Sequence, residues 1–172
     1  MKKASFKLSI IVIALIGFIA LGCKNQNNES SANGKALAFK NDLTEKAFLH
    51  YQEIKTALTK GNVDAAKIGG KKLSETISNN YMDVSNLSKE IATEDDIEKQ
   101  KVSFSKLTEA IQPIFESNIS EGALYKQFCP MALNNEGGYW FSTSETIENP
   151  YFEGKMDTCG SVKEVLKQSF LK

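Results

Sequence analysis

Residues 42–77 read DLTEKAFLHYQEIKTALTKGNVDAAKIGGKKLSETI, and this stretch decides the fold that we predict. In its first half, apolar side chains recur every three to four residues, at Leu43, Ala47, Tyr51, Ile54 and Leu58. Because an α-helix turns once in 3.6 residues, this spacing places them on one helix face. Asp42 with Glu45 forms a capping pattern at the start, and Gly61 tolerates the conformation that ends a helix. The sequence therefore predicts a first helix from about Asp42 to Gly61.

The second half of the stretch repeats the pattern. Asn62 is a good N-cap residue, and a second apolar stripe follows at Val63, Ala66, Gly70, Leu73 and Ile77. Gly69 and Gly70 together allow a neighbouring backbone to approach closely. We expect two helices packed as a hairpin.

Helical patterns continue after this hairpin. A short helix is predicted through Met82, Leu87 and Ile91. Thr93 and the acids after it then mark the start of a longer helix. Near the end of the chain, Ser161 and Glu164 form another capping box, which predicts a short final helix that buries Val162, Val165 and Leu166. The predicted fold class is all-α: an antiparallel bundle of about four helices, with an irregular Cys/Met/aromatic-rich segment and a short C-terminal helix.

The first 22 residues are typical of a secretory signal peptide. Lys2, Lys3 and Lys7 precede an apolar run that is too short to span a bilayer, which needs about 20 residues. The run ends in Ala-Leu-Gly-Cys, which resembles a lipoprotein cleavage box. We therefore predict a lipoprotein-type signal peptide over residues 1–22, a lipidated Cys23, and export to the periplasm or cell surface with a membrane anchor.

After the leader, residues 23–36 are polar and lack apolar periodicity, so they are predicted to form a flexible tether to a single domain over residues 37–172. Without the leader the chain keeps 18 basic against 21 acidic side chains. A mildly acidic balance does not favour nucleic acid as a partner, because nucleic acid requires a basic face.

The segment from Tyr125 to Gly160 carries the strongest chemical pattern. It holds two pairs of soft sulfur side chains, Cys129 with Met131 and Met156 with Cys159. Thiolates and thioethers select soft ions such as Cu(I) or Ag(I), whereas zinc sites seldom use methionine. The four residues are therefore candidate metal ligands.

A disulfide is the alternative interpretation of the same cysteines. In an exported protein, an even pair such as Cys129 and Cys159 is by default oxidised, and the two methionines would then fill gaps in the core. Closing this loop of some 30 residues would stabilise the fold by about 3.5 kcal/mol. A reduced pair could bind copper and an oxidised pair release it, so the two interpretations are compatible.

His50, the chain's one histidine, is a fifth candidate donor, although a lone histidine beside a buried helical stripe is more often structural. A catalytic interpretation would need a cysteine nucleophile with His50 as its base. Because nothing in the sequence supplies a third, orienting group, no enzymatic activity is predicted.

Aromatic side chains crowd the sulfur-rich segment. Too many are present for a solvated loop, so most should pack against the bundle, either simply as core or as a wall that holds the sulfur ligands in place. The residues expected to give this aromatic support are Tyr125, Tyr139, Trp140, Tyr151 and Phe152.

Four phrases carry a family resemblance. They are LYKQFCPMALNNEGGYWFS (124–142), IENPYFEGKMDTCG (147–160), HYQEIKTALTKGNVDAA (50–66) and DIEKQKVSFSKLTEAI (96–111). The chain resembles, over about Leu43 to Leu166, a bacterial domain of unknown function that occurs alone in exported proteins and on periplasmic adaptors of heavy-metal efflux pumps. The resemblance implies a helical fold, a role in copper or silver handling, and a site at Cys129, Met131, Met156 and Cys159.

The sequence thus predicts a lipid-anchored, exported protein that binds Cu(I), with Ag(I) as a second possibility, and that buffers the metal or delivers it to an efflux adaptor or metallochaperone. The alternative is a metal-free interaction module stapled by a Cys129–Cys159 disulfide.

Overall fold

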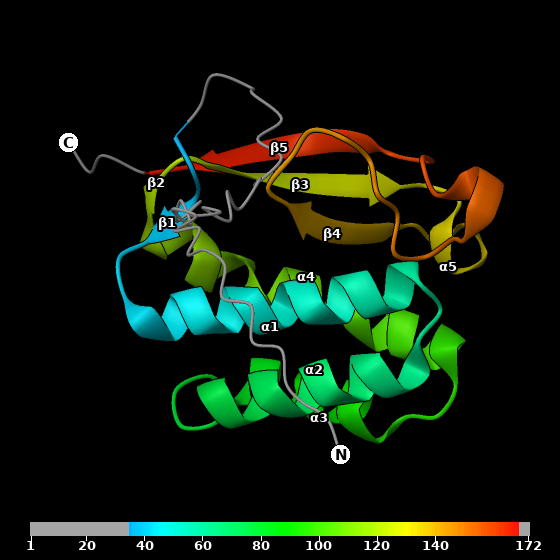
Figure 1. Ribbon diagram of the computed structural model, residues 1–172, viewed down its shortest axis with the longest axis horizontal. Helices are drawn as coiled ribbons and strands as arrows, with labels where there is room; N and C mark the ends of the chain where they lie inside the picture. The colour runs from blue at the N-terminus through cyan, green and yellow to red at the C-terminus, as the bar shows by residue number, and fades with distance from the viewer. Residues whose placement is uncertain (1–34, 169–172) are drawn as a thin grey trace, which may run out of the picture. The chain divides into compact units, whose positions relative to one another are not determined.

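The structure is a computed structural model that describes residues 35–168. Its helices and strands are arranged in layers (Figure 1). A three-stranded sheet packs on helices α1 and α4, and helices α2 and α3 lie on the far side of α1 and α4. The helices are α1 (Asp42–Thr59), α2 (Val63–Ile77), α3 (Met82–Thr93), α4 (Ile97–Asn118) and the short α5 (Ala132–Asn135). The strands are β1 (Ala38–Phe39), β2 (Ile119–Glu121), β3 (Ala123–Cys129), β4 (Gly138–Ser142) and β5 (Ser161–Lys167).

The four long helices match the predicted ones, with small differences at their starts. Asn41 caps α1, because its side chain accepts a hydrogen bond from the backbone N–H of Thr44 at 2.9 Å. Asn62 caps α2 as predicted, through the N–H of Ala65. The fourth helix begins later than expected, because the Asp96 side chain accepts from two backbone N–H groups of its first turn. The cap positions follow the side chains that can accept those bonds.

Gly69 and Gly70 bring α2 against both of its neighbours, as the sequence predicts. A Cβ atom on Gly69 would lie 2.8 Å from Cγ1 of Ile54 on α1, and one on Gly70 would lie 2.7 Å from the carbonyl oxygen of Ser88 on α3. Neither contact leaves room for a side chain, so these two glycines set the packing distance of α2.

The prediction of an all-α fold is wrong. The segment predicted to be irregular contains β3 and β4, and the predicted C-terminal helix is strand β5. The strand order is β4-β3-β5, with antiparallel pairing throughout, and β1 pairs with β2 in a separate antiparallel ladder. The fold therefore combines a four-helix bundle with a sheet that covers one side of it.

A bulge explains why β5 resembles a helix in sequence. The register shifts between Lys126 and Gln127, so that Glu164 pairs with Lys126 while Val162 pairs with Gln127. The extra residue, Lys163, breaks the alternation of a regular strand and gives the apolar residues of β5 a helix-like spacing. The Ser161–Glu164 pair imitates a capping box but caps nothing.

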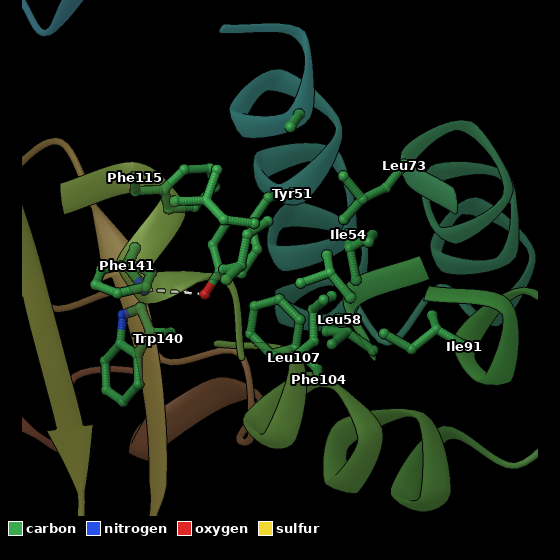
Figure 2. Close-up of a cluster of buried hydrophobic side chains, with 14 of the residues drawn as sticks. Tyr51, Ile54, Leu58, Leu73, Ile91, Phe104, Leu107, Phe115, Trp140 and Phe141 are labelled. Carbon is green, nitrogen blue, oxygen red and sulfur yellow. Dashed lines mark hydrogen bonds between the residues drawn. The ribbon is translucent and has the colours of Figure 1, made fainter. Parts of the chain in front are cut away.

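Aromatic side chains join the helices to the sheet (Figure 2). The ring of Tyr51 on α1 stacks on Phe104 of α4, with 5.0 Å between ring centroids, and it meets the edge of Phe115 at 5.7 Å. Phe141 of β4 completes this cluster at 5.8 Å from Phe115. All four side chains are fully buried, so this cluster is the centre of the core.

The free edge of β4 is held by helix side chains. The backbone N–H of Phe141 donates to the hydroxyl of Tyr51 at 3.0 Å, and the Gln52 side-chain amide donates to the Phe141 carbonyl at 3.2 Å. A sheet edge normally leaves such groups unpaired. Here two consecutive residues of α1 take the place of a further strand, which fixes β4, and the residues that pair with it, relative to the bundle.

No helix among residues 35–168 is long and apolar enough to cross a bilayer. The predicted signal peptide 1–22, the lipidation site Cys23 and the tether up to residue 34 lie outside the described residues.

Candidate functional site

Cys129 and Cys159 lie together at the end of the sheet near α5. Their Sγ atoms are 2.9 Å apart, although 30 positions separate them in the sequence. Cys129 is fully buried and Cys159 is partly buried, and both are free thiols. The structure thus brings the cysteine of one predicted sulfur pair into contact with the cysteine of the other.

The sheet positions Cys129. It is the last residue of β3 and pairs with Gly138 of β4, while the preceding residue, Phe128, pairs with Ser161 of β5. Cys159 lies two residues before the start of β5. Because β5 pairs with β3 from Ser161 onward, this pairing also places Cys159 at the end of β3. The cysteine contact is a consequence of strand register.

The two methionines lie in turns next to the cysteines, one after Cys129 and one before Cys159. Met131 follows Cys129 by two residues, precedes α5 and is 49% exposed. Met156 is partly buried and ends a 3-10 turn, η1 (Gly154–Met156), where its carbonyl accepts the N–H of Cys159 at 3.0 Å. Met131 would have to turn inward to place its sulfur on an ion held by the cysteines.

The turn after Met131 has a strained backbone. Leu133, Asn134 and Asn135 all have positive φ angles, of 53°, 58° and 70°. For a residue such as leucine, the left-handed region costs about 1–2 kcal/mol, whereas asparagine tolerates it better. The residue types at 134–138, NNEGG, favour a turn, but the left-handed conformation of Leu133 does not follow from its residue type.

Two of the predicted supporting aromatics are buried beside the cysteine pair. Trp140 is fully buried and Tyr151 is 3% exposed, and their rings meet edge to face at 5.9 Å. Glycines make room for both rings. A Cβ on Gly160 would lie 2.8 Å from Cη2 of Trp140, and one on Gly138 would lie 2.6 Å from the Tyr151 ring.

The other three predicted aromatics, Tyr125, Tyr139 and Phe152, are only partly buried. Tyr139 stacks against Phe128 at 4.5 Å between centroids, and the ammonium of Lys126 lies over its ring. Of the five, Trp140 and Tyr151 are therefore the buried ones, and they pack on Gly160, which follows Cys159, and on Gly138, which pairs with Cys129.

His50 has a different partner. Its Nδ1 lies 3.1 Å from the carboxylate of Glu53 one turn along α1, and Lys72 of α2 binds that same carboxylate. The imidazole therefore takes part in a polar contact between α1 and α2. Among residues 35–168, no group of three or more His, Cys, Asp or Glu side chains is placed to hold a metal ion.

The pKa of the Cys159 thiol is raised, first by its hydrogen bond with Cys129 and then by burial and the proximity of that thiol. A reactive cysteine needs a lowered pKa, because the thiolate is the nucleophile. Burial also raises the pKa of the Tyr151 hydroxyl well above its usual range. In the absence of an ion or oxidant, the site favours protonated, unreactive groups.

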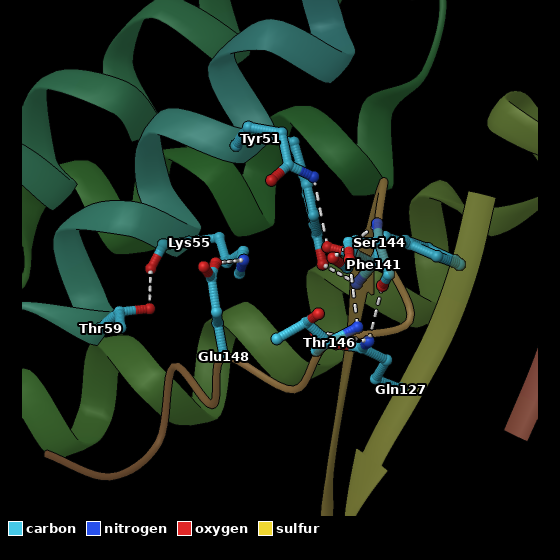
Figure 3. A network of polar contacts seen from close by, with 10 residues as sticks. Tyr51, Lys55, Thr59, Gln127, Phe141, Ser144, Thr146 and Glu148 are labelled. Carbon is cyan, nitrogen blue, oxygen red and sulfur yellow. Dashed lines mark hydrogen bonds and ion pairs between the residues drawn. The ribbon is translucent and has the colours of Figure 1, made fainter. Parts of the chain in front are cut away.

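Residues 143–148 cross the sheet and are held there by side chains that the sequence analysis missed (Figure 3). Buried Gln127 of β3 donates to the carbonyls of Ser144 at 2.9 Å and Thr146 at 3.1 Å. Glu148 pairs with the buried Lys55 of α1 at 2.8 Å. Gln127 itself was the one signal available in the sequence, since an amide that becomes buried needs hydrogen-bond partners.

Asn149 continues this support toward the cysteines, although its place before Pro150 in the sequence indicates only a turn. It is fully buried, and its side-chain amide donates to the carbonyl of Cys159 at 2.6 Å. Its Oδ1 accepts the N–H of Tyr151 at 2.8 Å, and its own N–H donates to the carbonyl of Asp157 at 2.7 Å. Asn149 thus closes the loop that carries Met156 and Cys159.

The geometry suits two kinds of sulfur chemistry. Two thiolates that bind one ion tetrahedrally, with bonds of about 2.3 Å as in zinc sites, stand about 3.8 Å apart. Two sulfurs in a disulfide are about 2.05 Å apart. The observed separation of 2.9 Å lies between these values, so a shift of less than 1 Å leads to either state. The residues fit a soft ion through two thiols, with the methionines as neighbouring donors.

Residues 47–122 match the family described as "Protein of unknown function (DUF3347)". The match runs from within α1 through α2, α3 and α4 and ends before β3, so it does not include the cysteine pair. In the same comparisons, no curated protein and no solved structure matched the chain.

Proposed function

We propose that this chain is a soft-metal-binding protein whose reduced Cys129–Cys159 pair holds Cu(I), or Ag(I) in its place. The observation that carries the proposal is the 2.9 Å contact between two thiols that come from distant parts of the sequence. Two thiolates held next to one another, one at the end of β3 and one in the loop before β5, form a chelate, and thiolates select Cu(I) over hard ions.

The surroundings of the pair support a soft ion. Met131 lies in the turn after Cys129 and Met156 in the 3-10 turn before Cys159, and each could add a thioether donor. Trp140 and Tyr151 are buried against the glycines that follow Cys159 and pair with Cys129. A thioether donor is uncommon for zinc, so the methionines favour copper or silver.

The cellular role that we propose follows from the sequence. A chain lipidated at Cys23 and exported to the periplasm or cell surface would buffer the metal, or pass it to an efflux adaptor or a metallochaperone. The resemblance to domains attached to heavy-metal efflux adaptors supports this role, and the matched family description adds no function to it. The proposal assigns no catalytic step to the site.

A Cu(I) competition experiment tests the binding proposal. The reduced protein is titrated with Cu(I) against a chromogenic chelator, in parallel with Cys129→Ser, Cys159→Ser and Met131→Ala/Met156→Ala variants. We expect one ion per wild-type chain, loss of binding in both cysteine variants, and about 10-fold weaker binding in the double methionine variant. Wild-type binding no tighter than that of Cys129→Ser would refute the proposal. If the methionine variant matches the wild type, the thioether donors are refuted but the thiol pair is not.

A second function rests on the same contact. If the pair is oxidised in the cell, the chain is a metal-free interaction module whose sheet is stapled by a Cys129–Cys159 disulfide. The raised pKa of the Cys159 thiol favours this form over metal binding, because a metal binds the thiolate and a raised pKa makes that thiolate less available. A parallel titration of the protein as isolated, without any reductant, separates the two functions, because the oxidised module takes up no Cu(I) before reduction.

A further inference from the structure

The two cysteines are held by different means. Cys129 ends a strand and has a ladder partner in Gly138. Cys159 lies outside the strands, and two hydrogen bonds position its backbone: its N–H donates to the carbonyl of Met156, and its carbonyl accepts from Asn149. The position of Cys159 therefore depends on the loop of residues 149–160 and on what closes that loop.

Asn149 closes the loop through three hydrogen bonds, each made by a different group of the residue. Its backbone N–H reaches Asp157, its Oδ1 takes the N–H of Tyr151, and its side-chain amide reaches the Cys159 carbonyl at 2.6 Å. The side chain is fully buried, so a hydrogen bond that it loses is not replaced by one to water, and the unpaired group lowers stability. An asparagine amide is suited to this position because it donates and accepts at once.

We propose that Asn149 is the positioning residue that presents Cys159 to Cys129, and so sets how readily the pair chelates a soft ion or closes into a disulfide. Part of this inference rests on the proposed function, because an ion must bind before Asn149 can affect its affinity. The disulfide part does not, since it concerns only the two thiols. Fixing two reacting groups in place lowers the entropy lost when they join.

Asn149→Asp tests the proposal with little change of shape. When the introduced carboxyl group is ionised, it still accepts from the N–H of Tyr151 but has no hydrogen to donate to the Cys159 carbonyl, so the measurements are made at a pH above its pKa. The matched control is Thr108→Val on α4, which removes a fully buried hydroxyl that bonds Tyr51 at 2.7 Å. Both variants lose a buried hydrogen bond, but only the first one touches the cysteine loop.

The first measurement is the thiol–disulfide equilibrium of the full chain in glutathione buffers. One glutathione disulfide takes two electrons and two protons from the pair, which yields two glutathione thiols and the protein disulfide. We expect the equilibrium constant for disulfide formation to fall about 10-fold in Asn149→Asp and to stay within about twofold of wild type in Thr108→Val. An unchanged constant in Asn149→Asp, or an equal fall in Thr108→Val, would overturn the proposal.

The second measurement is Cu(I) competition on the same proteins, where we expect about 10-fold weaker binding in Asn149→Asp. If the wild type binds no Cu(I), the proposed function fails while the glutathione equilibrium still decides the role of Asn149. If Asn149→Asp does not fold, Asn149→Ser replaces it with the same expected fall, because a serine hydroxyl is too short to reach the Cys159 carbonyl from position 149.

Discussion

The hydroxyl of Tyr51 accepts a hydrogen bond from the backbone N–H of Phe141, with 3.0 Å between oxygen and nitrogen. The same hydroxyl lies 2.7 Å from that of Thr108, which itself donates to the carbonyl of Phe104 at 3.0 Å. Because the Thr108 hydrogen is committed, Tyr51 must donate to Thr108. This chain of bonds links β4 to α1 and α4 inside the core, and burial raises the pKa of Tyr51 accordingly.

Tyr51→Phe should lower the free energy of unfolding by about 1–3 kcal/mol, because it leaves the N–H of Phe141 unpaired in the core. Urea denaturation measures the change. Leu49→Ala on the same helix is the control, since Leu49 is 56% exposed and its loss should cost less than about 1 kcal/mol. Equal stability of Tyr51→Phe and wild type would show that this bond does not hold the sheet to the bundle.

Gly160→Ala should destabilise the cysteine end of the sheet more than Gly154→Ala does. Both glycines have positive φ, 145° and 69°, so an alanine is strained at either one. A Cβ on Gly160 also meets Trp140 at 2.8 Å, whereas one on Gly154 has nothing within 4 Å. We expect a cost of about 1 kcal/mol for Gly154→Ala and about 2–4 kcal/mol for Gly160→Ala.

Fluorescence provides a second measurement for these variants, because Trp140 is the chain's one tryptophan. Gly160→Ala should shift its emission to the red as water reaches the indole, and Gly154→Ala should leave it unchanged. Equal stability and equal emission of the two variants would contradict the packing of Trp140 on Gly160.

Oxidation of the cysteine pair should stabilise the fold. Closing a loop of about 30 residues lowers the entropy of the unfolded chain by an amount equivalent to about 3.5 kcal/mol. Urea denaturation with and without reductant measures the difference in the free energy of unfolding. Cys129→Ser should remove the difference, and a wild-type protein equally stable in both states would show that the 2.9 Å contact does not lead to a disulfide.

The reduced, metal-free protein should lose stability above about pH 9. The folded pKa of Cys159 lies above its ordinary value of 9.0, so the folded thiol keeps its proton at a pH where the unfolded thiol has lost it. The folded state then binds more protons, and stability falls as pH rises toward the folded pKa.

Denaturation at about pH 8 and about pH 10, with a chelator present, measures this fall against Cys159→Ser. We expect the decrease to be smaller in the variant. Tyr51 and Tyr151 also have raised pKa values, but the ordinary value for tyrosine is 10.0, so they contribute mainly at higher pH. An identical decrease in both proteins would contradict the role of Cys159.

The helices were predictable because local patterns determine them. The stripe through Tyr51 and Ile54 and the cap at Asn62 each depend on residues within one or two turns. The sheet was missed because its strands lack the regular alternation of apolar and polar residues that identifies a strand in sequence. The bulge at Lys163 gives β5 a helical spacing, and β3 buries Gln127 where an apolar residue would be expected. Only long-range pairing resolves such segments.

The sequence predicts which residues belong to the candidate site, but it does not predict their separation or their hydrogen bonds. The sulfur side chains identify Cys129 and Cys159, but their separation depends on the β3–β5 register, which the sequence analysis did not contain. The Asn149–Pro150 pair indicates a turn, but the bond from Asn149 to the Cys159 carbonyl depends on how that loop folds back. The metal itself stays a prediction.

The most direct test of the proposed function is a count of free thiols and of bound copper on protein isolated from the cell envelope, denatured without reductant. The account predicts two free thiols at Cys129 and Cys159 and about one copper per chain. No free thiols and no copper would contradict it, and would leave a disulfide-stapled interaction module.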